Sequence, residues 1–307
     1  MATDQQATQT ALVTGAFSGI GLATALRLAQ DGWRVYAAGR NVSKNGELNT
    51  QARALGVEVK SIAMDVTDES SIETAIDQIA HESGRLDLLV NNAGGGYTGA
   101  VTDTSNRQMR QLFETNVIGV VAVTRLALPL MLRHQQGRVI NISSILGKAA
   151  FPGLGIYAAT KFAMEGFSDA MRLEFKILGP DFHVILIEPG FIKTHFADNS
   201  SNAESAAQAT PYGASYATTA ANVVNTGIDN APGPEIVADV IAKAARQHNP
   251  RSRYGVTTTA KMLMFLRRLL PNRAFDSVMF SASGLGKYIA TQRATNKQES
   301  AAKLTIS

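Results

Sequence analysis

The chain has 307 residues, of which 45% are hydrophobic and 18% charged, a composition typical of a globular protein with a well-filled core. The formal net charge is +4, and the lysines and arginines are scattered along the sequence, which argues against a nucleic-acid-binding protein. The chain contains no cysteine, which excludes disulfides, thiolate metal sites and a cysteine nucleophile. The five histidines share no ligand spacing, so we expect no metal site.

Short apolar segments rich in β-branched residues alternate along the chain with longer segments of helical periodicity. The expected strands are residues 10–15, 33–39, 57–66, 86–94, 137–144 and 182–190. The expected helices are residues 21–32, 68–84 with Asp68 as N-cap, 105–134, and a helix that begins near Tyr157. Nearly all strand residues are apolar, as in a parallel sheet with helices on both faces. The sequence therefore predicts an α/β fold with a doubly wound parallel sheet of the Rossmann type.

Two segments break this alternation. Residues 197–233 are rich in Ala, Ser, Thr and Asn and predict a flexible surface insertion. Residues 258–290 predict apolar and basic helical structure, and the most apolar stretch of the chain, residues 117–132, falls short of a membrane span. We expect one domain over residues 1–307, made of the following parts: a core at about 9–256, a substrate lid at about 195–233, a helical extension at about 258–290 and a polar tail at 291–307.

The sequence TGAFSGIG, from Thr14 to Gly21, lies between the first expected strand and the first expected helix. Gly15, Gly19 and Gly21 leave room for a pyrophosphate beside the backbone, and the following helix N-terminus favours negative charge. The alternative is a turn with a purely structural role. The position between strand and helix favours a dinucleotide site.

The second strand ends in Ala38-Gly39-Arg40 and provides no carboxylate for a ribose 2′-hydroxyl. The guanidinium of Arg40 can pair with a 2′-phosphate, although a solvated surface arginine is the alternative. This pattern predicts NADP(H) as the cofactor, in preference to NAD(H).

Tyr157 and Lys161 lie four residues apart, on one face of an expected helix. Such a pair also arises by chance. A free tyrosine has a pKa of about 10, and a nearby ammonium together with an oxidised nicotinamide would lower it. Tyr157 would then serve as a proton donor or acceptor near neutral pH.

Six motifs in this order resemble those of the short-chain dehydrogenase/reductase family over about residues 9–195, with weaker agreement to about 256. They are TGAFSGIG, NNAG at Asn91–Gly94, Asn116, NISS at Asn141–Ser144, Tyr157 with Lys161, and PGFIKT at Pro189–Thr194. Phe17 departs from the family pattern, where a small polar residue is common. The resemblance implies an oxidoreductase, such as a carbonyl reductase, that interconverts a ketone or aldehyde with an alcohol.

The resemblance implies that Tyr157 is the acid/base, Lys161 its partner and Ser144 the hydroxyl that orients the carbonyl. Ser144 fits better than Ser143 because it lies 13 residues before Tyr157, as in the family. Asn116 would hold a water in a proton relay, or else mark a helix irregularity. The implied cofactor-binding residues are Gly15, Phe17, Ser18, Gly19, Ile20, Gly21, Arg40, Asp65, Val66, Asn92, Ala93, Gly94, Tyr157, Lys161, Pro189, Gly190, Ile192 and Thr194.

The resemblance also implies a small-molecule carbonyl or alcohol substrate, of lipophilic hydroxysteroid-, retinol- or acyl-like type. We also expect a homodimer or homotetramer in the cytoplasm. For residues 258–280 we favour a helix packed on the domain over a pocket wall or a peripheral membrane contact. The alternative function is a catalytically silent, cofactor-binding regulator of the same fold, and an epimerase or dehydratase is a further alternative.

Overall fold

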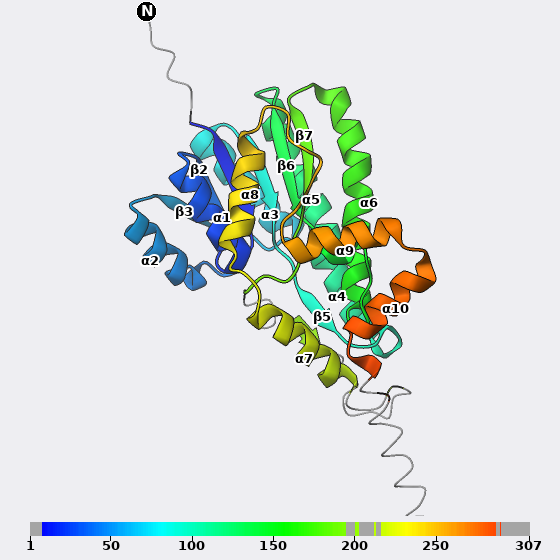
Figure 1. Ribbon diagram of the computed structural model, residues 1–307. Coiled ribbons are helices and arrows are strands. Elements are labelled where there is room, and N and C mark those ends of the chain that lie inside the picture. The colour runs from blue at the N-terminus through cyan, green and yellow to red at the C-terminus, as the bar shows by residue number, and fades with distance from the viewer. Residues whose placement is uncertain (1–7, 195–199, 203–211, 213–215, 287–288, 290–307) are drawn as a thin grey trace, which may run out of the picture.

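The computed structural model describes residues 8–194, 200–202, 212, 216–286 and 289. The described residues form a central parallel sheet of seven strands (Figure 1). In spatial order the strands are β3 (Val59–Ala63), β2 (Arg34–Gly39), β1 (Thr10–Thr14), β4 (Leu88–Asn91), β6 (Gly137–Ile142), β7 (Phe182–Glu188) and β9 (Arg253–Gly255). Every neighbouring pair is parallel, which confirms the predicted sheet.

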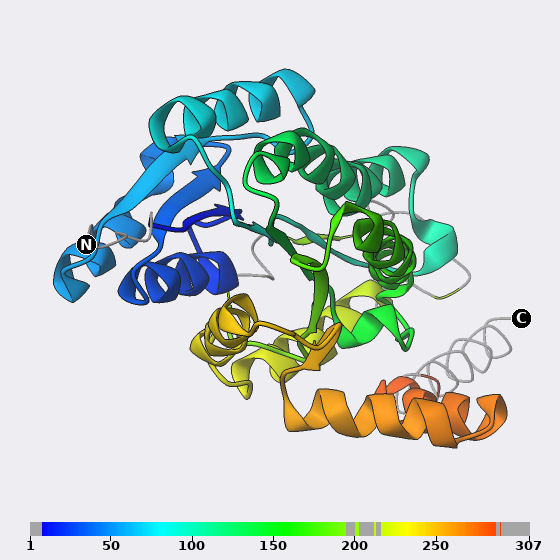
Figure 2. The same cartoon turned by 90° about the horizontal axis from the view of Figure 1, so that it is seen from above.

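Helices cover both faces of the sheet (Figure 2). One face packs against α1 (Gly19–Gln30), α2 (Gly46–Leu55) and α8 (Glu235–Arg246), and the other against α3 (Glu69–Ser83), α5 (Gly119–Leu132) and α6 (Gly155–Leu178). Alternate strand residues supply the two cores, because successive side chains point to opposite faces. Val13 enters the core under α1, whereas Leu12 enters the opposite core. The predicted N-cap Asp68 accepts from the backbone N–H groups of Ser70 and Ser71 and so begins α3.

The strand order places the functional cavity. The chain moves outward from β1 to β2 and β3, then returns to β4 beside β1 and moves outward in the other direction to β6, β7 and β9. The connections that follow β1 and β4 therefore diverge, and a crevice opens at the carboxyl ends of these strands.

Several elements were not predicted from the sequence. They are α2, α8, β9 and a separate pair of parallel strands, β5 (Gly96–Thr98) and β8 (Ser200–Asn202). Helix α2 gave a weak signal because only Leu48 and Ala52 are buried along it. The pattern of α8, by contrast, is strongly amphipathic and would have indicated a helix.

The long helix expected at 105–134 consists of α4 (Asn106–Phe113), a π-helical turn at Glu114–Ile118, and α5. By length and apolar composition, the longer helical segment Asn106–Leu132 could cross a membrane, whereas the expectation of a stretch that falls short of a span concerned only residues 117–132. Val123 and Ala127 are nonetheless fully buried against the sheet and α3. The apolar character of α5 is therefore that of a core helix.

The C-terminal part adds α7 (Tyr216–Asp229), α9 (Thr258–Leu269) and α10 (Asn272–Ala282). The predicted helical extension is thus two helices that meet at Leu270 and Pro271. The predicted flexible insertion contains α7, because alanine favours helix and Val224 and Ile228 bury one face of it. The rest of that segment, apart from 200–202, 212 and 230–233, and residues 290–307 of the predicted tail lie outside the described residues.

Candidate active site

A cavity of about 1190 Å³ opens at the carboxyl ends of the strands. Of the predicted cofactor-binding residues, all but Gly21 line it. Gly21 lies just behind the wall, where a Cβ atom would overlap the carbonyl oxygen of Gly15 and lie 2.5 Å from Nδ2 of Asn92. Residues of five of the six motifs therefore line one cavity, and Asn116 is not among the lining residues.

The glycine-rich turn is shaped for close approach of the backbone. Gly15 has φ +63°, and a Cβ there would lie 2.9 Å from Cα of Ala93. The side-chain amide of Asn92 braces the turn by donating to the carbonyls of Thr14 and Gly15 at 2.9 and 3.0 Å. Ser18 precedes α1 without capping it through its side chain. The first N–H groups of α1 thus remain available at the cavity, and the site fits a dinucleotide pyrophosphate.

Phe17, the departure from the family pattern, packs over the end of β2. A Cβ on Gly39 would lie 2.5 Å from two ring carbons of Phe17, so the glycine makes room for the ring. The ring lines the cavity beside Arg40. The substitution therefore leaves the turn intact and adds an apolar surface next to the predicted adenosine end.

Basic residues gather beyond the end of β2. Arg40 and Lys44 line the same part of the cavity as Asn41, whose side chain accepts from the N–H of Ser43 and begins a short 3₁₀ turn. This turn brings Lys44 back toward the cavity. Sequence reasoning missed Lys44, although its position four residues after Arg40 was a usable signal.

Asp65 lines the cavity from the loop after β3, and its side chain accepts from the N–H and the hydroxyl of Thr67 at 3.0 and 2.8 Å. The carboxylate is thus held in a local turn. The role of Asp65 near an adenine stays a prediction.

Ser144, Tyr157 and Lys161 meet at the centre of the cavity wall. Ser144 follows β6, and the other two lie in the first turns of α6. A hydrogen bond joins the hydroxyls of Ser144 and Tyr157. Nζ of Lys161 donates to the carbonyl oxygen of Ile142 at 2.8 Å and lies 5.7 Å from the centre of the Tyr157 ring.

Burial governs the electrostatics of the pair. Burial raises the pKa of Tyr157 above its ordinary value, and only the hydrogen bond from Ser144 opposes this rise. Burial also lowers the pKa of Lys161 from 10.5 to about 8, while the carboxylate of Glu165 opposes that shift. Without a cofactor, desolvation therefore dominates both groups, and the expected lowering of the Tyr157 pKa, which includes the charge of a bound nicotinamide, stays a prediction.

Asn116 lies one layer behind the cavity, in the π-helical turn, and is fully buried. Its amide donates to the carbonyl of Gly95 at 2.9 Å and to Oγ1 of Thr160 at 3.1 Å, and it accepts from the N–H of Gly95 at 2.9 Å. Thr160 in turn donates to the carbonyl of Tyr157 at 2.7 Å. The helix irregularity foreseen as an alternative is present, and the side chain connects the NNAG loop to α6.

The loop after β7 closes the cavity opposite α6. Pro189, Gly190, Ile192 and Thr194 all line it. A Cβ on Gly190 would lie 2.5 Å from Oγ1 of Thr257, the N-cap residue of α9, so this glycine lets α9 pack on the loop.

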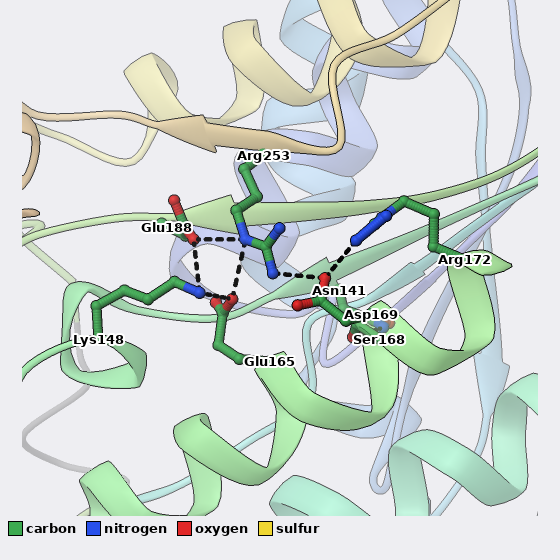
Figure 3. A network of polar contacts seen from close by, with 8 residues as sticks. All are labelled: Asn141, Lys148, Glu165, Ser168, Asp169, Arg172, Glu188 and Arg253. Atoms are coloured by element: carbon green, nitrogen blue, oxygen red, sulfur yellow. Dashed lines mark hydrogen bonds and ion pairs between the residues drawn. The ribbon is translucent and has the colours of Figure 1, made fainter. Parts of the chain in front are cut away.

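A network of charged residues joins α6 to the ends of β7 and β9 (Figure 3). Glu165, one turn after Lys161, pairs with Nζ of Lys148 at 2.5 Å and with Nε of Arg253 at 3.3 Å. Glu188 at the end of β7 approaches the same two cations at 3.8 and 3.4 Å. Burial and the nearby Glu165 raise the pKa of Glu188 to about 7. The sequence did not indicate this network, because its members come from four separate segments.

The other part of the cavity is apolar. Side chains from the loops after β6, from α7 and from the C-terminal helices line it: Ile145, Leu146, Phe151, Leu154, Val223, Val224, Ile228, Met262, Leu263, Leu266, Val278 and Met279. Of the alternatives for residues 258–280, the structure thus supports a pocket wall as well as a packed helix. Among the described residues no group of three or more His, Asp or Glu is placed to hold a metal ion.

A doubly wound parallel sheet with a glycine-rich turn at its switch point defines a dinucleotide-binding α/β protein. The chain belongs to the short-chain dehydrogenase/reductase family, because residues 9–205 match the family described as short chain dehydrogenase. It is therefore an oxidoreductase of the NAD(P)-binding type.

Relatives and solved structures agree with this placement. The uncharacterized oxidoreductase YbbO of Escherichia coli K12 is 36% identical over 271 residues, which cover 87% of this chain and 93% of YbbO. The 3-ketodihydrosphingosine reductase of Bacteroides thetaiotaomicron is 35% identical over 257 residues, 83% of this chain and 90% of that one.

A short-chain dehydrogenase from Streptomyces avermitilis has a TM-score of 0.75 at 30% identity, over 94% of this chain and 99% of that one. Two further family structures hold different cofactors. A Burkholderia phymatum member is in complex with NAD (TM-score 0.76, 25% identity, 85% and 93% coverage). A metagenomic member is in complex with NADP (TM-score 0.64, 27% identity, 81% and 97% coverage).

Proposed function

We propose that this protein is an NADP(H)-dependent oxidoreductase that interconverts a lipophilic ketone or aldehyde with the corresponding alcohol. The observation that carries the proposal is the meeting of Ser144, Tyr157 and Lys161 where the glycine-lined part of the cavity meets its apolar part. A substrate carbonyl in the apolar part would thus lie beside the phenol, and a cofactor on the glycine turn would lie on the other side.

The cofactor preference rests on charge at the end of β2. Arg40 and Lys44 line the cavity there, and Gly39 occupies the position where a carboxylate would accept from a ribose 2′-hydroxyl. Two cations suit a 2′-phosphate, which carries negative charge and several acceptor oxygens. These residues would therefore hold the adenosine end of NADP(H), with Gly15 and the N-terminus of α1 on the pyrophosphate.

The chemistry of the chain's own residues suits proton transfer to a carbonyl oxygen. The bound nicotinamide would supply or accept the hydride. Tyr157, whose pKa burial raises, is protonated at neutral pH, as an ordinary tyrosine is, and can donate its proton to a developing alkoxide because the alkoxide is the stronger base. The hydroxyl of Ser144 would orient that oxygen, and Lys161, with a pKa lowered to about 8, can exchange protons near neutral pH.

The substrate class rests on the apolar lining and on one relative. Side chains of α7, α9 and α10 give this part of the cavity branched aliphatic and methionine surfaces, which bind apolar ligands by excluding water. The Bacteroides relative is named for the reduction of 3-ketodihydrosphingosine, which is a lipid ketone. We extend that substrate class, and not that substrate, to this protein.

The test is a turnover assay with NADPH and ketones of graded size and polarity, on the wild type and on Tyr157→Phe. The substitution keeps the ring but removes the exchangeable proton. It should leave the Kd for NADPH nearly unchanged and reduce kcat by about 10²–10⁴-fold.

Tyr36→Phe is the matched control, because Tyr36 also loses one hydroxyl hydrogen bond, to Glu82, and lies on β2 away from the cavity. Undiminished turnover in Tyr157→Phe would overturn the mechanism. NADPH binding by the wild type without oxidation on any ketone would instead favour the cofactor-binding regulator.

A further inference from the structure

Helices α9 and α10 leave large apolar side chains exposed on the outside of the protein. Met262, Phe265 and Leu269 are 56%, 63% and 64% exposed. They lie at positions i, i+3 and i+7 of α9 and so form one stripe along the helix. Phe280 of α10 is 44% exposed. We call these four residues the outer stripe.

The outer stripe is not the surface of a loosely attached helix. The opposite side of the two helices is packed: Phe275 and Met279 of α10 are buried in one cluster with Ala149, and Leu263 and Leu266 of α9 pack against it. The guanidinium of Arg267 also lies 5.1 Å from the centre of the Phe275 ring. The inner face of α9 and α10 thus packs on the core, whereas the face that carries the outer stripe has no partner among the described residues.

Positive charge surrounds the outer stripe. Residues 257–286 contain Lys261, Arg267, Arg268 and Arg273 against a single acid, Asp276. All four cationic side chains are exposed, and none pairs with a carboxylate of the described residues. Bulky apolar side chains flanked by lysine and arginine are the pattern of a surface that lies on anionic lipid.

The cavity opens at the same surface. Met262 belongs to the outer stripe and also lines the cavity, and the exposed residues Val278 and Ala282 of α10 line it too. An apolar compound at this surface would therefore reach the cavity along Met262 and Leu266 without crossing open water.

We propose that the outer stripe and its four cations are a docking surface for an anionic lipid membrane, through which a lipophilic substrate enters the cavity. The entry route rests on the proposed function, whereas membrane docking does not. A second copy is a poorer occupant, because a two-fold interface would place this basic surface against itself. Residues 287–307 are poorer too, since they carry four basic residues and one acid and do not complement the charge.

The experiment uses the full chain and vesicles of phosphatidylcholine, alone or mixed with phosphatidylglycerol. The protein should float with the mixed vesicles and not with phosphatidylcholine alone, and added NaCl should release it. Phe265→Asp with Leu269→Asp should abolish flotation. Arg268→Glu should weaken binding about fivefold or more, because one cation at an anionic surface contributes about that factor.

Leu55→Asp is the matched control, since Leu55 is 46% exposed on α2, on the opposite side of the protein (Figure 1). Turnover of a water-soluble ketone should be unchanged in all variants, because neither Phe265 nor Leu269 lines the cavity. If the wild type turned over no ketone, the proposed function would be contradicted, and the flotation result would still test membrane docking.

Three outcomes would overturn the membrane assignment. The first is equal flotation of the double variant and the Leu55→Asp control. The second is a change of oligomeric state in the double variant, measured by light scattering, while vesicle binding persists, which would assign the stripe to a second copy. The third is flotation only after removal of residues 290–307, which would assign it to that segment.

Discussion

Lys161 is buried, and its ammonium donates to one backbone carbonyl and lies one helical turn from the carboxylate of Glu165. Burial lowers the pKa of Lys161, and Glu165 opposes that effect. Glu165 in turn is held by Lys148 and Arg253. The protonation of the residue next to Tyr157 thus depends on a carboxylate that faces away from the cavity.

We predict that Glu165→Gln moves the activity profile to lower pH. Loss of the negative charge lowers the pKa of Lys161 further below about 8, so the ammonium is lost at a lower pH than in the wild type. The alkaline fall of kcat/KM for ketone reduction should shift accordingly. Glu174→Gln, at an exposed position of the same helix, serves as control. An unshifted profile would show that Glu165 does not tune Lys161.

Arg40 determines cofactor preference in our proposal. Arg40→Asp should reduce the ratio of kcat/KM for NADPH to that for NADH by about 10- to 100-fold, because a hydrogen bond to a charged group contributes about 1.5–3 kcal/mol. Arg53→Asp makes the same charge change at an exposed position of α2 and should leave the ratio nearly unaltered. An equal NADPH-to-NADH ratio of kcat/KM in Arg40→Asp and Arg53→Asp would contradict the role of Arg40 in cofactor preference.

At the scale of elements, the cofactor half and the substrate half of the cavity are built differently. The cofactor half consists of loops that directly follow β1, β2, β3, β4 and β7. The substrate half consists largely of helices α7, α9 and α10, which follow the sheet in sequence or interrupt its alternation. The substrate wall can therefore change without disturbing the cofactor turn.

We predict that Leu263→Ala combined with Leu266→Ala raises KM for a bulky apolar ketone by about tenfold or more, since each lost pocket methylene contributes about 1–3 kcal/mol. The Kd for NADPH should hardly change. Met264→Ala is the control on the same helix, because Met264 points toward Gly255 of β9 and does not line the cavity. Truncation at residue 260 is a less specific test, as it also removes the buried Phe275 and Met279.

For the whole molecule, Glu188 couples stability to pH. Its pKa is raised from 4.5 to about 7 in the folded protein, chiefly by burial. Between these values the folded state holds a proton that the unfolded chain has lost. The contribution of Glu188 to the free energy of unfolding therefore falls as the pH rises from 4.5 to about 7.

Glu188→Gln should remove this contribution. The free energy of unfolding of the variant, measured by urea denaturation, should rise relative to the wild type as pH increases from 4.5 to 7. Above pH 7 the difference should stay constant, because Glu188 is then ionised in both states. Glu174→Gln should show no such trend, and a parallel pH dependence of wild type and Glu188→Gln would contradict the shifted pKa.

The sequence by itself determined the local features of this protein. Buried strands read as continuous apolar segments, and the turn after β1 needs glycine at Gly15, where φ is positive. Tyr157 and Lys161 share a helix face because they are one turn apart. These properties depend on residues close in the chain, so the hydrophobic pattern and the residue spacing were sufficient to predict them.

Only the tertiary structure decided the environment of those residues. The raised pKa of Tyr157 and the lowered pKa of Lys161 come from burial under several segments, which spacing does not encode. Lys148, Glu165, Glu188 and Arg253 meet although 105 residues separate the first from the last. The apolar part of the cavity likewise exists because α7, α9 and α10 fold back over the sheet, and contacts between such distant segments follow from packing alone.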